Sequence, residues 1–265
     1  MKSRLSAFTI CLLFALLAIA PASGIRVSGV ILVTDVSPGE DILHLMTVDI
    51  GESSEAVDVV AQLYGCGMAL DGSRVQLPAE EDTGPYSARG FLKLDPERVT
   101  VEPGAKTTII LQGTVPQDVG DGGRYALVNI ATVPKGSEVV GFSSAVEVPV
   151  FLTINGSEIV ETGDITDVKA SEEDEGLLMD VMFENTGNHH YRASVEAVLK
   201  DGEGNVAAEA TAPLSENSII PTYTRLFPIQ FDEGEDLASG TYTFEVSVIK
   251  EDGTVLDTAE TTIEV

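Results

Sequence analysis

The stretch that decides the fold is residues 91–130, FLKLDPERVTVEPGAKTTIILQGTVPQDVGDGGRYALVNI. Apolar and polar residues alternate along it, and prolines and glycines interrupt the alternation at short intervals. Alternation with a period of two is typical of half-buried β-strands, and proline and glycine are typical of the turns between them. The stretch therefore predicts four short strands.

The second half of the chain repeats this plan. Tyr125 and Tyr242 each follow a glycine by two residues, at the start of a late strand. Sandwiches of the immunoglobulin class place a "tyrosine corner" at such a position. No convincing helical period occurs after the first 24 residues, so the sequence predicts an all-β chain of two tandem immunoglobulin-like sandwiches.

The chain of 265 residues is long enough for two such domains. We expect the first sandwich over residues 25–155 and the second, immunoglobulin- or fibronectin-like, over residues 156–265. Residues 66–90 contain many glycines, prolines and acids, which indicates a long binding loop. Residues 155–175 look like the hinge between the domains.

Residues 1–24 have the pattern of a cleaved signal peptide. Lys2 and Arg4 precede an apolar run over residues 10–20, and small residues at 20–22 follow. A basic start, an apolar centre and a small-residue cleavage site are typical of secretory signals. We therefore expect a secreted protein without a transmembrane anchor, associated with the cell surface.

The composition is strongly acidic. The chain holds 43 acidic and 15 basic residues, and loss of Lys2 and Arg4 with the signal leaves a net charge of −30. Such a surface repels nucleic acid, which excludes nucleic-acid binding as a function. It agrees with solubility, with cation binding or with adaptation to high salt.

Cysteine use excludes an internal disulfide. Cys66 is the one cysteine after the predicted signal. We expect a small buried side chain there, and intermolecular pairing is the alternative.

Several motifs resemble known families. Residues 95–125, with their Pro-Gly turn and the run GGRY, resemble the first domain of periplasmic pilus chaperones. They are still more similar to the extracellular peptidoglycan-binding domain of WxL-interacting proteins. The run FENTGN at 183–188, Asp201-Gly202 and Tyr242 resemble the partner domain of the latter family. The resemblance implies two sandwiches that bind other molecules, and pilus chaperones pair a strand with a surface subunit.

No catalytic constellation is evident in the sequence, and we expect no enzyme and no resident cofactor. Calcium is the one ion that the acidic loops suggest, since calcium takes several carboxylate and carbonyl oxygens. The candidate ligands are Asp232, Glu233, Glu235 and Asp236. Residues 172–175 and the pair Asp118 and Asp121 are further acidic clusters, and a solvated acidic coat explains all of them equally well.

Three other motifs carry weaker expectations. Asn155 begins an Asn-Gly-Ser sequon, which predicts a glycosylation site. Val146, Val148 and Val150 alternate along the last strand of the first sandwich, which predicts a strand that pairs with a partner. His189-His190 offers a transition-metal contact, although adjacent strand residues diverge and the sequence places no third ligand.

These features favour a non-catalytic, cell-surface interaction or adhesion module. Its partner would be an envelope polymer or a surface protein, with self-assembly as a further mode. The alternative is an assembly factor, like the pilus chaperones, that pairs a strand with a surface subunit. The least supported alternative is a secreted hydrolase with paired carboxylates such as Glu80 and Asp82.

Overall fold

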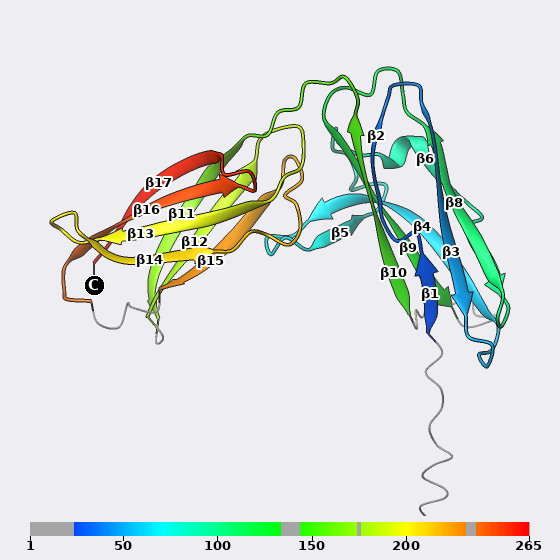
Figure 1. Ribbon diagram of the computed structural model, residues 1–265, viewed down its shortest axis with the longest axis horizontal. Coiled ribbons are helices and arrows are strands. Elements are labelled where there is room, and N and C mark those ends of the chain that lie inside the picture. Colours follow the sequence, from blue (N-terminus) through cyan, green and yellow to red (C-terminus); the bar gives the residue numbers. More distant parts are fainter. Residues whose placement is uncertain (1–23, 134–143, 174–175, 232–236, 265) are drawn as a thin grey trace, which may run out of the picture.

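The computed structural model describes residues 24–133, 144–173, 176–231 and 237–264, and it is all-β (Figure 1). Within these residues, seventeen strands form two sandwiches that lie side by side and meet at an angle. The predicted signal peptide and the proposed calcium ligands at 232–236 lie outside the described residues. No helix among the described residues is long and apolar enough to cross a membrane.

The first sandwich uses the first ten strands. They are β1 (Ile25–Ser28), β2 (Leu32–Val36), β3 (Asp41–Ile50), β4 (Val57–Met68), β5 (Arg74–Leu77), β6 (Leu92–Asp95), β7 (Arg98–Val101), β8 (Lys106–Thr114), β9 (Gly123–Val133) and β10 (Ala145–Ile154), with one short 3₁₀ turn, Arg89–Phe91. One sheet has the order β1-β3-β8-β6, and the other has the order β2-β10-β9-β4-β5 with β7 also paired to β4. Residues 91–130 thus form four strands, β6 to β9, as predicted.

The second sandwich uses the last seven strands. They are β11 (Gly163–Glu173), β12 (Gly176–Asn185), β13 (Ala193–Lys200), β14 (Val206–Ala212), β15 (Thr224–Phe231), β16 (Thr241–Lys250) and β17 (Val255–Glu264). Its sheets have the orders β11-β12-β15 and β14-β13-β16-β17. In β16 every second residue from Tyr242 to Val248 is buried, which is the period-two pattern of a half-buried strand.

The core of the first sandwich lies between its two sheets. Val48, Val59, Ile109, Ile130 and Val148 are almost fully excluded from solvent there. β9 is buried on both faces, because Tyr125 and Leu127 belong to an apolar cluster shared with the second sandwich, whereas Ala126, Val128 and Ile130 belong to the core of the first. Arg74 of β5 lies over the Phe151 ring of β10, and Gln76 donates a hydrogen bond to Glu147 of β10.

Two sequence-based expectations need correction in extent. The predicted long loop at 66–90 begins with a hairpin, since β4 continues to Met68 and pairs with β5. Gly72, with a φ of +81°, lies in the turn of that hairpin, where a left-handed backbone favours glycine. The predicted hinge is also shorter, because residues 163–173 form β11.

The two tyrosines that follow glycines are not equivalent. The Tyr242 hydroxyl donates to the Ala238 carbonyl (2.9 Å), four residues upstream, as in a tyrosine corner. Tyr125 instead lies on the outer face of its sheet and contacts the second sandwich. The prediction of a tyrosine corner at Tyr125 is therefore wrong. The prediction of two sandwiches does not depend on it, because it follows from alternating burial along the strands.

Candidate functional site

The hairpin of β4 and β5 projects toward the second sandwich and docks on the edge of β15 (Figure 1). The Leu226 amide donates to the Leu70 carbonyl (2.8 Å), and the Asn217 side chain donates to the Gly72 carbonyl (3.3 Å). The Arg225 guanidinium lies against Gly72 and over the Phe227 ring. The turn of the first sandwich therefore covers part of a strand edge in the second.

A second contact lies at the end of β10. The His190 ring packs edge to face against Tyr125 and Phe151, with centroids 5.6 and 4.9 Å apart. The Tyr125 hydroxyl lies 3.2 Å from His190 Nδ1. The Gly123 amide donates to the Asn188 carbonyl (2.8 Å). One buried apolar cluster thus includes residues of both sandwiches, which holds them at a defined angle.

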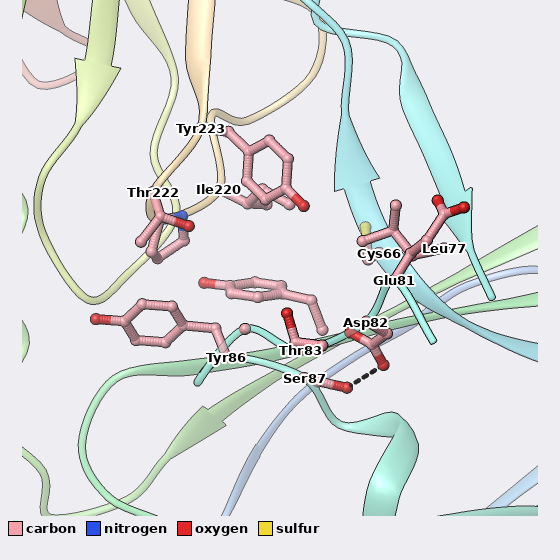
Figure 2. Close-up of a pocket in the computed structure, with 13 residues that line it drawn as sticks. Cys66, Leu77, Glu81, Asp82, Thr83, Tyr86, Ser87, Ile220, Thr222 and Tyr223 are labelled. Atoms are coloured by element: carbon pink, nitrogen blue, oxygen red, sulfur yellow. Dashed lines mark hydrogen bonds between the residues drawn. The ribbon is translucent and has the colours of Figure 1, made fainter. Parts of the chain in front are cut away.

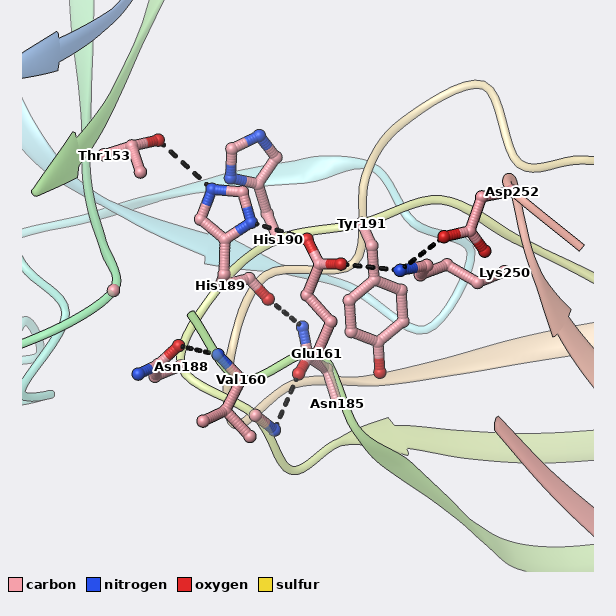
Figure 3. A network of polar contacts seen from close by, with 12 residues as sticks. Thr153, Val160, Glu161, Asn185, Asn188, His189, His190, Tyr191, Lys250 and Asp252 are labelled. Atoms are coloured by element: carbon pink, nitrogen blue, oxygen red, sulfur yellow. Dashed lines mark hydrogen bonds and ion pairs between the residues drawn. The ribbon is translucent and has the colours of Figure 1, made fainter. Parts of the chain in front are cut away.

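A polar network continues from this contact (Figure 3). His189 bridges the Thr153 hydroxyl through Nε2 (3.1 Å) and the Glu161 carboxylate through Nδ1 (2.9 Å). Lys250 binds both Glu161 (2.7 Å) and Asp252 (2.8 Å). The network ties the last strand of the first sandwich to β16 through the connecting segment.

The network and its surroundings shift several pKa values. Burial, together with the positive potential of His189, lowers the pKa of His190 to about 4, so this ring is neutral at pH 7. Burial alone raises the pKa of Glu161, but hydrogen bonds from Lys250 and His189 outweigh it and lower the pKa below its ordinary value. These shifts favour a neutral His190 ring and an ionised Glu161 paired with Lys250.

A cavity of about 280 Å³ opens between the sandwiches (Figure 2). The loop after β5 supplies acidic and hydroxyl side chains, and the segment before β15 supplies the opposite wall. The rings that line it are those of Tyr86, Tyr125 and Tyr223. Its polar lining includes Glu81, Asp82, Thr83, Ser87 and Thr222.

Cys66 lines the same cavity and is buried, as predicted. Burial raises the pKa of its thiol to about 12, so the thiol is protonated and a poor nucleophile at neutral pH.

A further feature is the outer edge of strand β10, part of which has no neighbouring strand among the described residues. Its partner β9 runs along its whole length, whereas β2 covers it only from Val150 to Ile154. Between β1 and β2 the chain crosses from the other sheet into this one, and Gly29 in the crossing segment has a φ of +73°. Among the described residues, no strand therefore pairs with the outer edge of β10 at Ala145 and Glu147.

The backbone groups at this edge follow from the register. The Ile154 amide donates to the Gly122 carbonyl on the β9 side, and the Asn155 amide donates to the Val36 carbonyl on the β2 side. Because backbone groups alternate along a strand, odd-numbered residues of β10 face away from β9. Glu147 thus directs its N–H and C=O outward, whereas Pro149 contributes no donor. Val30 and Ile31, 41% and 57% exposed, lie in the segment that joins β1 to β2.

The three valines that the sequence predicts to pair with a partner strand, Val146, Val148 and Val150, differ in burial. Val148 and Val150 are fully buried in the core of the first sandwich, and Val146 is partly buried against it. Even-numbered residues face β9, so the outward groups between these valines belong to Glu147. A role of the three valines in strand pairing stays a prediction.

The remaining candidates lie apart from one another. Asn155 is exposed in the turn after β10, and glycosylation there stays a prediction. The Ser157 hydroxyl of its sequon donates to the Ile154 carbonyl (2.6 Å). Glu80 is exposed, whereas Asp82 pairs with Arg89 (3.0 Å), so these two carboxylates have different surroundings. Among the described residues, no group of three His, Cys, Asp or Glu side chains is placed to hold a metal.

The prediction that the side chains of His189 and His190 diverge is wrong. Their rings do not diverge but lie with centroids 4.3 Å apart, and protein partners engage both nitrogens of His189. The sequence signal for this junction was the polar run around Asn185, in which turn-forming residues precede two imidazoles. Nothing local in the sequence pointed to Tyr86 or Tyr223, because their neighbours come from the other sandwich.

Comparisons with known proteins give a likeness of architecture. No family model matches the chain, and no curated protein matches it. A class 5 fimbriae chaperone, CfaA, has 14% identity and a TM-score of 0.40, with 91% of this chain and 98% of that chain covered. The chaperone DraB of E. coli has 13% identity and a TM-score of 0.39, with 92% and 98% covered. The SafB chaperone of Salmonella enterica, solved with the SafA pilin, has 10% identity and a TM-score of 0.39, with 92% and 98% covered.

Proposed function

We propose that this chain is a non-catalytic, exported module that captures an extended segment of a cell-envelope protein by β-strand addition. The observation that carries the proposal is the open edge of β10 at Ala145 and Glu147. An unpaired edge offers backbone donors and acceptors that another chain can complete. This is the assembly-factor alternative of the sequence analysis, and it is more specific than a general adhesion module.

The surroundings of the edge support capture of a short segment. Val30 and Ile31 give it an exposed apolar flank, which an incoming apolar side chain would cover. Pro149 removes one donor just before the pairing with β2 begins at Val150, which limits the length that can pair. The second sandwich contacts the outer face of the same sheet through the apolar cluster that includes Tyr125 and Phe151.

The test uses an array of decapeptides tiled from envelope proteins of the source organism. Glu147→Pro removes the outward amide without removing a hydrogen bond to β9, so the fold should persist. Glu147→Ala is the matched control, since it loses the same contact with Gln76 but keeps the amide. Wild type and Glu147→Ala should bind peptides with alternating apolar residues, and Glu147→Pro should bind them at least tenfold more weakly.

Substitutions at Val148 and Val150 are poorly suited to this test, because both side chains are buried in the core and a loss of capture would follow from unfolding. Circular dichroism should show the same strand content in both Glu147 variants. Equal peptide binding by Glu147→Pro and Glu147→Ala would contradict strand addition at this edge, and binding of envelope glycans alone would favour an adhesion module.

A further inference from the structure

The cavity between the sandwiches has an unusual balance of charge. Of the 13 residues that line it, the charged ones are Glu81 and Asp82, and none is lysine or arginine. Around them lie hydroxyl groups and the rings of three tyrosines. Such a lining repels anions and offers a cation both carboxylate oxygens and aromatic faces.

Asp82 is the better placed of the two carboxylates. Its side chain is only 6% exposed. The Ser87 hydroxyl (2.6 Å) and the Arg89 guanidinium (3.0 Å) both donate to Oδ2. Among the described residues, no hydrogen bond reaches Oδ1, which lies against Gly65 of β4, so Asp82 brings a largely buried carboxylate to the cavity wall.

The opposite wall belongs to the second sandwich. Tyr223 lies across the cavity from Asp82 (Figure 2). Burial, and then the neighbouring Cys66 and Asp82, raise the pKa of its hydroxyl. The aromatic wall thus lies within the field of the carboxylate, where a positive charge would be stabilised from two sides.

From this lining, we propose that the cavity binds a primary ammonium group on an aliphatic chain, such as a lysine side chain. The ammonium would bind the carboxylates of Glu81 and Asp82 and neighbouring hydroxyls, and the methylenes would lie against the tyrosine rings. A neutral chain gains only the ring contacts, whereas an ammonium also gains the electrostatic ones. The net charge of −28 also raises the local concentration of cations. This site is separate from the edge of β10 and does not depend on strand addition.

The test is a titration followed by nuclear magnetic resonance at pH 7.5. The probe is N-acetyl-lysine methylamide, and N-acetyl-norleucine methylamide serves as the probe that lacks the ammonium. The lysine probe should bind at least tenfold more tightly, and its binding should weaken in high salt. Equal binding of the two probes, or no saturable binding of the lysine probe at millimolar concentration, would overturn the proposal.

Variants separate the site from the general acidity. Glu81→Gln should weaken binding several-fold, whereas Glu80→Gln removes the same charge from an exposed neighbour outside the lining and should leave it unchanged. Asp82→Asn should abolish the preference for the lysine probe. Because that variant also breaks the ion pair with Arg89, Tyr223→Leu provides an independent loss from the other wall. Unchanged affinity in both Glu81→Gln and Tyr223→Leu would place the ammonium elsewhere.

Discussion

At the scale of single residues, the contact that His189 and His190 make with the first sandwich depends on the buried side-chain amide of Asn185. Asn185 is fully excluded from solvent at the end of β12. Its Nδ2 donates to the carbonyls of His189 (2.9 Å) and Ile219 (2.8 Å), and its Oδ1 accepts from the Gly187 amide (2.9 Å). Three backbone groups of two segments thus find their partner in a single side chain, which fixes the turn that carries both histidines.

Removal of this amide should therefore be costly. Asn185→Ala removes all three hydrogen bonds of a fully buried side-chain amide, and we expect a loss of about 3 kcal/mol in the free energy of unfolding. Asn205→Ala is the control, because its amide bonds Asp201 in an exposed turn, and we expect a loss below about 1 kcal/mol. Urea denaturation of both variants measures the difference. Similar losses in the two would contradict the role given to Asn185.

Acid should weaken the same junction through His190. Its pKa is lowered to about 4 in the folded protein from an ordinary 6.5, so the fold favours the neutral ring. The lowered pKa of His190 therefore adds to the free energy of unfolding. This stabilisation, up to about 3 kcal/mol, is fully present above pH 6.5 and is lost as the pH falls toward 4. Of the groups that face the ring, His189 opposes its protonation and Glu161 favours it. The Tyr125 hydroxyl is neutral.

Urea denaturation across this pH range isolates the effect. His190→Phe keeps a ring against Phe151 but removes the titration, so its stability should fall less steeply between pH 6.5 and 4 than that of the wild type. The difference between the two curves removes the contribution of the other carboxylates. Parallel curves would show that His190 does not govern the acid sensitivity.

At the scale of elements, most strands follow from the sequence because burial alternates within them. In β13 and β16 every inward position is apolar, so a local pattern is sufficient. The sequence predicts a loop where β4 and β5 form a hairpin, because Gly65 and Gly67 interrupt the alternation and the residues that the hairpin contacts are remote in the sequence. The open edge of β10 could not be predicted from a local pattern either, because it depends on where β2 begins relative to Val150.

Two valines on adjacent strands test this description of the sheet. Val148 of β10 is fully buried, whereas Val33 of β2 is 60% exposed. Val148→Ala should cost about 2 kcal/mol of stability through lost burial and a residual cavity, and Val33→Ala should cost well under about 1 kcal/mol. Thermal unfolding measures both. A larger loss at Val33 would mean that β2 packs differently from the description given above.

At the scale of the whole molecule, the angle between the sandwiches depends on contacts that no local pattern encodes. Leu70 and Leu226 are joined by a backbone hydrogen bond, and Tyr125 and His190 by a side-chain one. Each pair is far apart in the sequence, so the alternation that predicts the strands says nothing about their meeting. Both the cavity and its ligand preference depend on this angle, because its two walls belong to different sandwiches.

Gly72 is one position at which a small change bears on this angle. Its φ is +81°, and a Cβ there would collide with the Arg225 guanidinium. Gly204 has a similar φ of +85° in the turn between β13 and β14, but no atom lies within 4 Å of its would-be Cβ. The two glycines therefore share the backbone strain that an alanine would introduce, and only Gly72 has the interdomain contact.

Gly72→Ala should push the hairpin away from β15 and broaden the angle between the sandwiches. Small-angle scattering should then show a larger radius of gyration than in the wild type, with each sandwich intact by circular dichroism. Gly204→Ala should lose a comparable amount of stability, about 1 kcal/mol, without a change in radius. An unchanged radius in Gly72→Ala would mean that the contacts of His189 and His190 hold the angle on their own.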